Sequence, residues 1–376
     1  MPDTAMNMIS VAAIETIPLR IPFKTDGYAD AYLWGEKLTA ADSLLVKVTT
    51  NTGVEGWGEA FGFGAVSSVK IAVDELIAPL CIGQDVTRIE PLMLAVQKKL
   101  HVYGRGGALT YGLSAVDIAL WDIAGKLANA SVSRLLGGGV ADMPCYASLP
   151  CYSDPPLVRA QVRRVIEAEF RAIKLHEADL PAIRAAREEA GPDIELIVDV
   201  GCPWTLTEAQ NLAVELKAVN LKFLEEPLWP PENFDGLAEL RRTTGIPISS
   251  GENVSTLMEF EHVLDTKAVD FIQPSPAKMG GISELCKIFP LAAVHNVPVM
   301  THSFYDGPGL LAAIHTTAAL GTSDSMIEWR RFDLEAAIYG DALSPHTGRI
   351  SVPLAPGLGI DPDPDVIGAY RSDTAT

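Results

Sequence analysis

Three acidic residues, each closing a short apolar run, could together hold a metal ion. Asp199 follows Ile-Val, Glu225 follows Phe-Leu, and Glu252 follows the run that begins at Ile246, so that successive acids are 26 and 27 residues apart. This interval accommodates one strand, one helix and two loops, and the carboxyl ends of successive parallel strands meet in the mouth of a β/α barrel. Three carboxylates gathered there would repel one another unless a cation lay between them, and Mg²⁺ prefers such oxygen ligands. Single acids are usually just exposed, but the even spacing of the set favours a magnesium site.

A pair of basic side chains ends another apolar run. Lys174 and His176 are separated by Leu175, and the alternation of side chains along a strand directs both of them to one face. Two potential cations in a barrel are costly unless an anion accompanies them, so we expect them to contact the carboxylate of a substrate. The alternative is a structural ion pair between each of them and a nearby acid.

His302 is the candidate general base. It ends the apolar run at 297–302, and Asp270 stands near the start of the preceding run at 269–274. Because a carboxylate beside an imidazole fixes its tautomer and raises its basicity, we hypothesise a dyad of Asp270 and His302 on adjacent strands. Glu328 ends the last apolar run and could exchange a proton near the substrate or hold Lys174. A histidine at a strand end can also be a polar residue with no role in catalysis.

These residues need a barrel to bring them together. From residue 144 onward, short apolar runs alternate with helical stretches, a pattern typical of parallel βα units. Strands are predicted at 145–148, 172–176, 196–200, 221–226, 246–251, 269–274, 297–302 and 326–329. Eight strands at nearly regular intervals favour a closed α/β barrel over an open sheet.

A smaller α+β domain precedes the barrel. Residues 9–19, 42–50 and 53–60 alternate apolar and polar side chains around a hairpin signal at 51–53. Residues 66–126 are predicted to be helical, with a strongly amphipathic helix at 113–126. The glycines at 137–139 then break the pattern. We predict the α+β domain over residues 1–138, the barrel over 139–334 and a last segment over 335–376 that returns to the first domain.

The composition is that of an acidic globular protein. The chain has 376 residues, of which 48% are hydrophobic and 20% charged, and its net charge is −19. This surface repels nucleic acid and anionic membranes, so neither is expected as a partner. Five scattered cysteines without a CxxC pair fit reduced thiols better than disulfides or a zinc site. With neither a signal peptide nor a membrane-spanning run in the sequence, we predict a soluble cytoplasmic protein.

The motifs as a set resemble the enolase superfamily and, within it, the mandelate racemase subgroup. They occur in a consistent order over nearly the whole chain, namely residues 113–125, 135–138, Lys174-x-His176, Asp199, Glu225-Glu226-Pro227, Gly251-Glu252-Asn253, Asp270, Lys278-Met279-Gly280-Gly281, His302 and Glu328-Trp329. The resemblance implies a modified (β/α)7β barrel of the TIM type with an N-terminal α+β capping domain. It also implies one Mg²⁺ per subunit on Asp199, Glu225 and Glu252, and a homo-oligomer with an even number of subunits.

Several positions depart from the pattern of that family. His176 replaces a lysine that is an acid/base in many relatives, and it could act similarly or only bind a hydroxyl. Ser275 stands where the muconate-lactonizing and dipeptide-epimerase branches carry a lysine base, which disfavours those branches. Gly201 argues against the galactonate- and mannonate-dehydratase types that have a histidine there. Lys278 matches a lysine that is present in the racemase subgroup as well, and we expect it to be structural.

The resemblance implies removal of the proton α to the carboxylate of a small anionic substrate, which gives an enolate stabilised by Mg²⁺. We assign this step to His302, oriented by Asp270, with Lys174 and Glu328 near the developing charge. Dehydration of an acid sugar is favoured because one dyad suffices for it, whereas a racemase or epimerase needs a second base such as His176. Cycloisomerisation of a sugar lactone or anhydro sugar is a further outcome of the same enolate. A metal-binding protein that has lost catalysis is the non-enzymatic alternative.

The substrate itself is not defined by the sequence. The aromatic-rich stretches at 23–34 and 61–64 are candidate lids over the site. Trp204, Trp229 and Tyr305 could also shape a pocket, or belong to the core.

Overall fold

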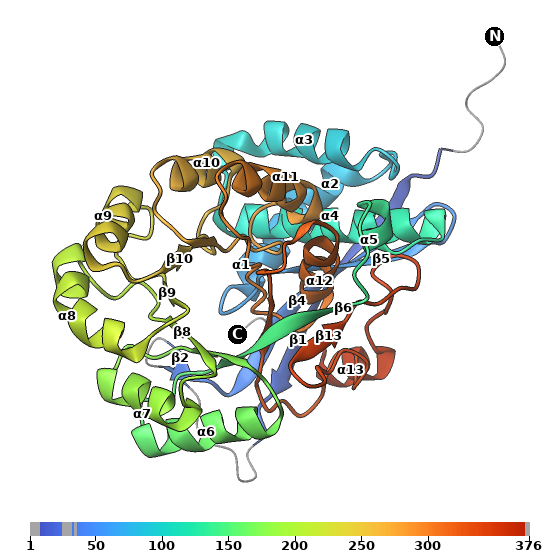
Figure 1. Cartoon of the computed structure of the whole chain (residues 1–376). Coiled ribbons are helices and arrows are strands. Elements are labelled where there is room, and N and C mark those ends of the chain that lie inside the picture. Colours follow the sequence, from blue (N-terminus) through green and yellow to red (C-terminus); the bar gives the residue numbers. More distant parts are fainter. Residues whose placement is uncertain (1–7, 25–31, 34–35, 373–376) are drawn as a thin grey trace.

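The structure, a computed structural model, describes residues 8–24, 32–33 and 36–372 (Figure 1). A small antiparallel sheet with several helices precedes a barrel of parallel strands. In Figure 1 the strands β6 to β10 surround the centre of the barrel, and the helices α6 to α11 lie outside them. Among the described residues, no helix is both long and apolar enough to cross a membrane.

The first part of the chain is an α+β unit, as predicted. Its antiparallel sheet has the order β1-β4-β5. The strands are β1 (Val11–Pro22), β4 (Ala40–Thr50) and β5 (Glu55–Ala60), with a separate hairpin of β2 (Tyr32–Leu33) and β3 (Glu36–Lys37). The helices are α1 (Val66–Ile71), η1 (Ala72–Ile77), α2 (Ala78–Cys81), α3 (Ile89–Leu100), η2 (His101–Tyr103) and α4 (Gly107–Ala128), followed by α5 (Val132–Leu135). Much of the candidate lid at 23–34 lies outside the described residues.

Helix α4 attaches this unit to the barrel through buried polar contacts. The indole Nε1 of Trp121 donates to Ser283 Oγ at 2.9 Å, and the backbone N–H of Ser283 donates to Asp117 Oδ1 at 3.0 Å. The N–H of Gly280 donates to Ser114 Oγ at 2.8 Å. Each of these barrel groups belongs to the start of helix α11 or the residue before it, so the small unit is held against one end of the barrel.

The barrel is built from short parallel strands joined by helices. Neighbouring strands follow the order β11-β10-β9-β8-β7-β6-β12. The strands are β6 (Asp142–Leu149), β7 (Ala172–Leu175), β8 (Glu195–Asp199), β9 (Phe223–Glu225), β10 (Ile248–Ser250), β11 (Phe271–Ile272) and β12 (Ile327–Arg330). The helices are α6 (Pro155–Glu167), α7 (Leu180–Ala190), α8 (Leu206–Val219), α9 (Phe234–Thr244), α10 (Leu257–Asp265), α11 (Gly281–Val294) and α12 (Pro308–Leu320).

The predicted seventh strand at 297–302 is not a regular strand. It lies beside β11 as a single bridge between Val299 and Ile272, and the N–H of Ile272 donates to Pro298 O. Proline has no N–H to add to a ladder, which limits regular pairing at this position. The N–H of His302 still donates to Pro274 O, so the residue follows the direction of the neighbouring strand.

The two-residue period of the strands directs the polar residues into the barrel. Lys174, Asp199 and Glu225 each lie two residues beyond a side chain of one small buried cluster, which contains Tyr146, Ala172, Ile197, Phe223, Met300 and Met326. The intervening residues, such as Val198, face the larger core outside the strands. A cluster that takes alternate residues from different strands fills the interior of the barrel. Lys174, Asp199 and Glu225 therefore lie inside the barrel, between this apolar cluster and the mouth at the carboxyl ends of the strands.

The last segment contacts both parts of the molecule. Strand β13 (Arg349–Ser351) pairs with β6, whereas the N–H of Leu358 donates to Asp122 in helix α4. Helix α13 (Pro364–Tyr370) follows, and the N–H of Ser372 donates to Pro18 O in β1. The division of the chain at residues 138 and 334 stays a prediction, because these contacts do not separate the parts sharply.

Candidate active site

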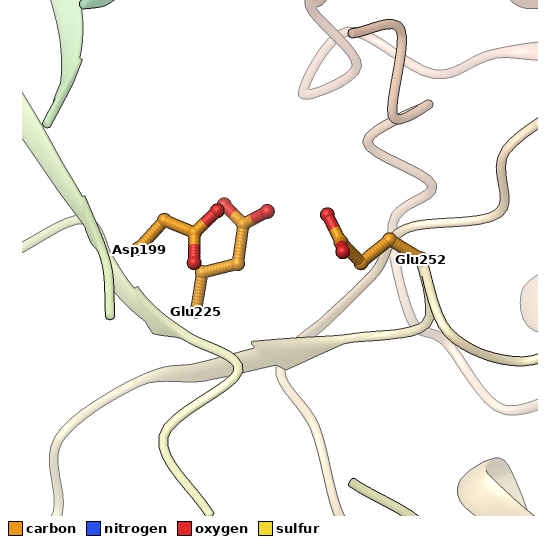
Figure 2. Close-up of side chains that lie close together, drawn as sticks. All are labelled: Asp199, Glu225 and Glu252. Atoms are coloured by element: carbon orange, nitrogen blue, oxygen red, sulfur yellow. The ribbon is translucent and has the colours of Figure 1, made fainter. Parts of the chain in front are cut away.

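The three predicted carboxylates converge at the mouth of the barrel (Figure 2). Asp199 and Glu225 end their strands and stand opposite each other in the β8–β9 pairing, and Glu252 lies two residues beyond β10. One oxygen from each acid lies within 4.8 Å of the others. The spacing of the apolar runs thus placed the three acids correctly, and their role as metal ligands stays a prediction.

The local electrostatics fit a bound divalent cation. Glu225 is fully buried, and its Oε2 has no hydrogen-bond partner among the described residues. Burial raises the pKa of Glu225 well above its usual range; Lys174 lowers it, while Asp199 raises it further. A buried anion in this position is costly without a compensating charge. Three carboxylates with one free, inward-facing oxygen form a donor set that suits Mg²⁺.

Lys174 is the buried cation that links these acids to Glu328. Its Nζ lies 2.6 Å from Glu225 Oε1, 3.0 Å from Asp199 Oδ2 and 3.2 Å from Glu328 Oε1. Burial alone would lower the pKa of Lys174, but the three carboxylates hold it well above the usual range. Glu328 also accepts from Ser148 Oγ at 2.8 Å, and the cations around it, Lys174 first, outweigh its burial and lower its pKa to about 2. Lys174 and Glu328 are therefore a charged pair beside the triad.

His176 approaches the same triad from β7. Its Nδ1 lies 2.7 Å from Leu149 O, which requires the proton on Nδ1, and its Nε2 lies 3.4 Å from Asp199 Oδ2. Burial lowers the pKa of His176, with Asp199 opposing that effect. The side chain lines the central cavity and is partly exposed to it. Its Nε2 is the atom available to a substrate.

The predicted dyad of Asp270 and His302 is wrong. Asp270 immediately precedes β11, and its backbone N–H donates to Ile248 O at the start of β10, so it lies at the end of the strands remote from the mouth. Its Oδ1 is 2.6 Å from Arg241 Nη2, and its Oδ2 accepts from the N–H of Ile248 at 2.9 Å. Asp270 therefore pairs with the end of helix α9, and the error lay in the position assigned to it along the strand.

His302 instead has a hydroxyl as its partner. Its Nδ1 lies 3.0 Å from Ser275 Oγ, and its Nε2 lies 3.0 Å from Glu252 Oε2. Ser275 follows β11 just as Glu252 follows β10, which places it at the correct end of the barrel. The signal that could have located it is the sequence Gln273-Pro274-Ser275, because the proline marks where the strand ends.

Comparison with known proteins places the chain in a family. Residues 36–137 match the family model of the mandelate racemase / muconate lactonizing enzyme N-terminal domain, and residues 157–366 match that of the enolase C-terminal domain-like family. The chain belongs to the mandelate racemase subgroup of the enolase superfamily. The modified barrel with an N-terminal capping domain is the fold of that family, and its members include dehydratases, cycloisomerases and racemases.

Individual relatives of this superfamily member carry different activities. This chain is 30% identical to the arabinonate dehydratase of Saccharolobus solfataricus over 337 residues, which cover 87% of this chain and 90% of the dehydratase. It is 32% identical to the D-galactarolactone cycloisomerase of Agrobacterium fabrum over 352 residues, 87% of this chain and 91% of that one. A racemase from Streptomyces coelicolor A3(2), solved with bound magnesium, is 26% identical and has a TM-score of 0.83 over 96% of this chain and 100% of that one.

The capping domain and the barrel together form a cavity of about 500 Å³, which Asp199 and Glu252 line. Aromatic side chains from both domains form much of its wall, namely Phe61, Phe63, Tyr111, Trp229 and Phe304. Of the residues predicted to shape the pocket, those at 61 and 63 and Trp229 line it, Tyr305 is buried behind it, and Trp204 is not among the lining residues. Tyr111 and Phe304 were missed, although Phe304 lies only two residues beyond His302 and Tyr111 two residues before the motif at 113–125.

Lys278 also faces this cavity, although the sequence suggested only a structural role. Its Nζ lies 3.6 Å from Glu252 Oε1 and 3.3 Å from Asn253 Oδ1, and 4.7 Å from the centre of the Phe61 ring. Burial opposes ionisation of Glu252, but Lys278 and His302 together hold its pKa well below the usual range. Lys278 thus keeps Glu252 ionised and contacts the capping domain.

Proposed function

We propose that this chain is a Mg²⁺-dependent acid-sugar dehydratase. The ion would be held by Asp199, Glu225 and Glu252, one per subunit. The observation that carries the proposal is the convergence of these three carboxylates, with the imidazole of His176 beside Asp199 and that of His302 beside Glu252. The names of relatives such as the arabinonate dehydratase support this class of substrate.

The chemistry begins at a carbon acid that is barely reactive in water. Removing a proton next to a carboxylate places a second negative charge on the substrate, and positive charge near its oxygens lowers that cost. When bound, Mg²⁺ supplies such charge. Lys174 adds a fixed cation beside the triad, and Glu328 keeps it oriented. These residues prepare the site for the developing dianion before any bond breaks.

His302 then removes the α-proton through its Nε2. The electron pair of the α C–H bond forms the C=C bond as the β C–O bond breaks, and the imidazolium of His302 returns its proton to the leaving hydroxyl. Water and an enol result, and the enol tautomerises to a 2-keto-3-deoxy acid. The substrate is therefore a small carboxylate with hydroxyls on the α- and β-carbons.

One observation favours a second candidate, cycloisomerisation or epimerisation. His176 Nε2 lies 3.4 Å from Asp199 and His302 Nε2 lies 3.0 Å from Glu252, so the two imidazoles approach the triad at different acids. Because Asp270 does not contact His302, no carboxylate behind the ring makes His302 a stronger base than His176. Two bases could remove a proton and deliver one at different positions of the same enolate.

A screen of acid sugars by proton NMR in D₂O with Mg²⁺ decides between these outcomes. Dehydration gives a 3-deoxy product with a new proton signal at C3, which carries one hydrogen and one deuterium from the solvent. Deuterium incorporation without loss of water would contradict dehydration and favour an isomerase. Equilibrium binding of Mg²⁺ without turnover or exchange of any acid would favour a metal-binding protein that has lost catalysis. A His302→Asn variant with full activity would remove His302 as the base.

A further inference from the structure

His302 is held by a chain of two hydroxyl groups behind the active site. Its Nδ1 lies 3.0 Å from Ser275 Oγ, and Ser275 Oγ lies 2.5 Å from Tyr305 Oη. Tyr305 Oη lies 3.0 Å from the backbone oxygen of His302 and accepts from the N–H of Ala277 at 3.4 Å. The side chains of His302, Ser275 and Tyr305 are all buried, so water does not compete for these hydrogen bonds.

We propose that Ser275 and Tyr305 are positioning residues that keep a proton on His302 Nδ1 and leave Nε2 as the atom that exchanges protons with the substrate. The proposal deepens the proposed function, since it concerns the base of the same reaction. It assigns to two neutral hydroxyls the task that a carboxylate performs in a carboxylate–histidine pair.

The count of protons in this chain supports the assignment. The phenol of Tyr305 has one proton, and the backbone oxygen of His302 can only accept, so that proton is used there. The bond between Ser275 and Tyr305 must then use the hydroxyl proton of Ser275. Oγ of Ser275 is left as an acceptor toward His302, which requires a proton on Nδ1. On the other side of the ring, Nε2 lies 3.0 Å from Glu252 Oε2, and an ionised carboxylate only accepts, so a proton shared with Glu252 is additional to the one on Nδ1 and is the one that His302 exchanges. If both hydroxyl protons turned the other way, the buried backbone oxygen of His302 would lose this partner.

The phenol remains a donor over the working pH range. Burial raises the pKa of Tyr305 well above its usual range, and the hydrogen bonds from Ser275 and Ala277 only partly oppose this. The ring of Tyr305 also packs edge-on against the imidazole, with 6.0 Å between ring centres, which restricts rotation of His302. The chain therefore sets both the tautomer and the orientation of the base.

The first test needs no substrate. In protein labelled with ¹⁵N-histidine, His302 is assigned by the signal that disappears in His302→Gln. We expect a protonated Nδ1 in the wild-type protein, and we expect Tyr305→Phe to yield a fraction with unprotonated Nδ1, since Ser275 is then free to donate. An unprotonated Nδ1 of His302 in the wild type would overturn the proposal, whatever the enzyme turns over.

The second test is kinetic and uses whichever acid the screen identifies. We expect Tyr305→Phe to lower kcat on the order of tenfold and Ser275→Ala up to about a hundredfold, with KM changed little, because general-base catalysis contributes about 10²–10⁴-fold. Ser275→Thr keeps the hydroxyl group, so its kcat should be close to that of the wild-type protein and well above that of Ser275→Ala. Tyr339→Phe is the matched control, since Tyr339 Oη is buried and has no hydrogen-bond partner among the described residues, and it should leave kcat unchanged.

Two results would contradict the proposal in this test. One is an unchanged kcat in Tyr305→Phe. The other is a rise in KM at constant kcat, which would make the hydroxyls part of substrate binding. Absence of turnover with every acid would defeat the proposed function, but the tautomer measured by NMR would still decide the role of Ser275 and Tyr305.

Discussion

Replacing Asp270 with Asn tests whether this carboxylate supports the fold or the reaction. It pairs with Arg241 at 2.6 Å, with side chains that are 29% and 37% exposed, and it accepts the N–H of Ile248. An ion pair this exposed contributes about 0.2–1 kcal/mol, and a neutral hydrogen bond about 1 kcal/mol. Asparagine keeps an acceptor for Ile248, so the free energy of unfolding should fall by about 1 kcal/mol, and by about 2 kcal/mol for Asp270→Ala. The rate of α-proton removal should not change.

Urea unfolding followed by circular dichroism measures the first quantity, and deuterium exchange at the α-carbon measures the second. Glu239→Gln is the matched control, because it breaks a more exposed pair with Arg242 on the same helix α9 and should cost less than about 0.5 kcal/mol. A hundredfold loss of α-proton exchange in Asp270→Asn at wild-type stability would refute this reasoning. It would mean that Asp270 acts on His302 over a distance that the structure does not allow.

Three further predictions concern buried ionisable groups. Lys174→Met should abolish activity and lower the free energy of unfolding by about 3–5 kcal/mol, because it leaves buried carboxylates uncompensated; a loss under about 1 kcal/mol by urea unfolding would argue against that reason. Burial raises the pKa of Glu59 from 4.5 to about 7, so this acid binds a proton more tightly in the folded state and stability should fall as the pH rises through that window, by at most about 3 kcal/mol. Glu59→Gln, which keeps an acceptor for Gly307 and Gly309, should remove this dependence in unfolding curves measured across the window. Burial lowers the pKa of His315 from 6.5 to about 4, so the unfolded state binds its proton first and stability should fall by at most about 3 kcal/mol as the pH drops through that window; a His315→Gln variant with the same slope would contradict this.

The convergence of the three carboxylates could be predicted from the sequence because its determinants are local. Asp199 and Glu225 each end an apolar run, and the period of a strand fixes the face on which each side chain lies. Nearly equal intervals between runs then imply equivalent positions on neighbouring strands, and the register of β8 and β9 follows from that equivalence. Lys174 shares that face on β7, where it stands opposite Ile197, two residues before Asp199.

The partner of His302 could not be predicted in the same way. A run of apolar residues does not show where hydrogen bonding begins and ends, and β11 contains only Phe271 and Ile272. Asp270 and Ser275 flank this short strand on opposite sides, so an error of a few residues exchanges one end of the barrel for the other.

The aromatic residues of the cavity wall could not all be predicted, for another reason. Tyr111 reaches the cavity only because helix α4 docks on the barrel, and no spacing near His176 or His302 encodes that contact.

Charge balance would let such an acidic protein accept the anionic substrate that we propose for it. The ion pairs around the triad contain four carboxylates and two lysines, namely Asp199, Glu225, Glu252, Glu328, Lys174 and Lys278. With all six ionised and the imidazoles neutral, the group carries two excess negative charges, which would repel a carboxylate across a short, poorly screened distance. A divalent cation cancels this excess. The substrate should therefore bind measurably only after the metal, whereas the metal should bind without the substrate. Calorimetric titration of an acid into the metal-free protein should give no binding, and tight binding there would mean that other cations neutralise the site.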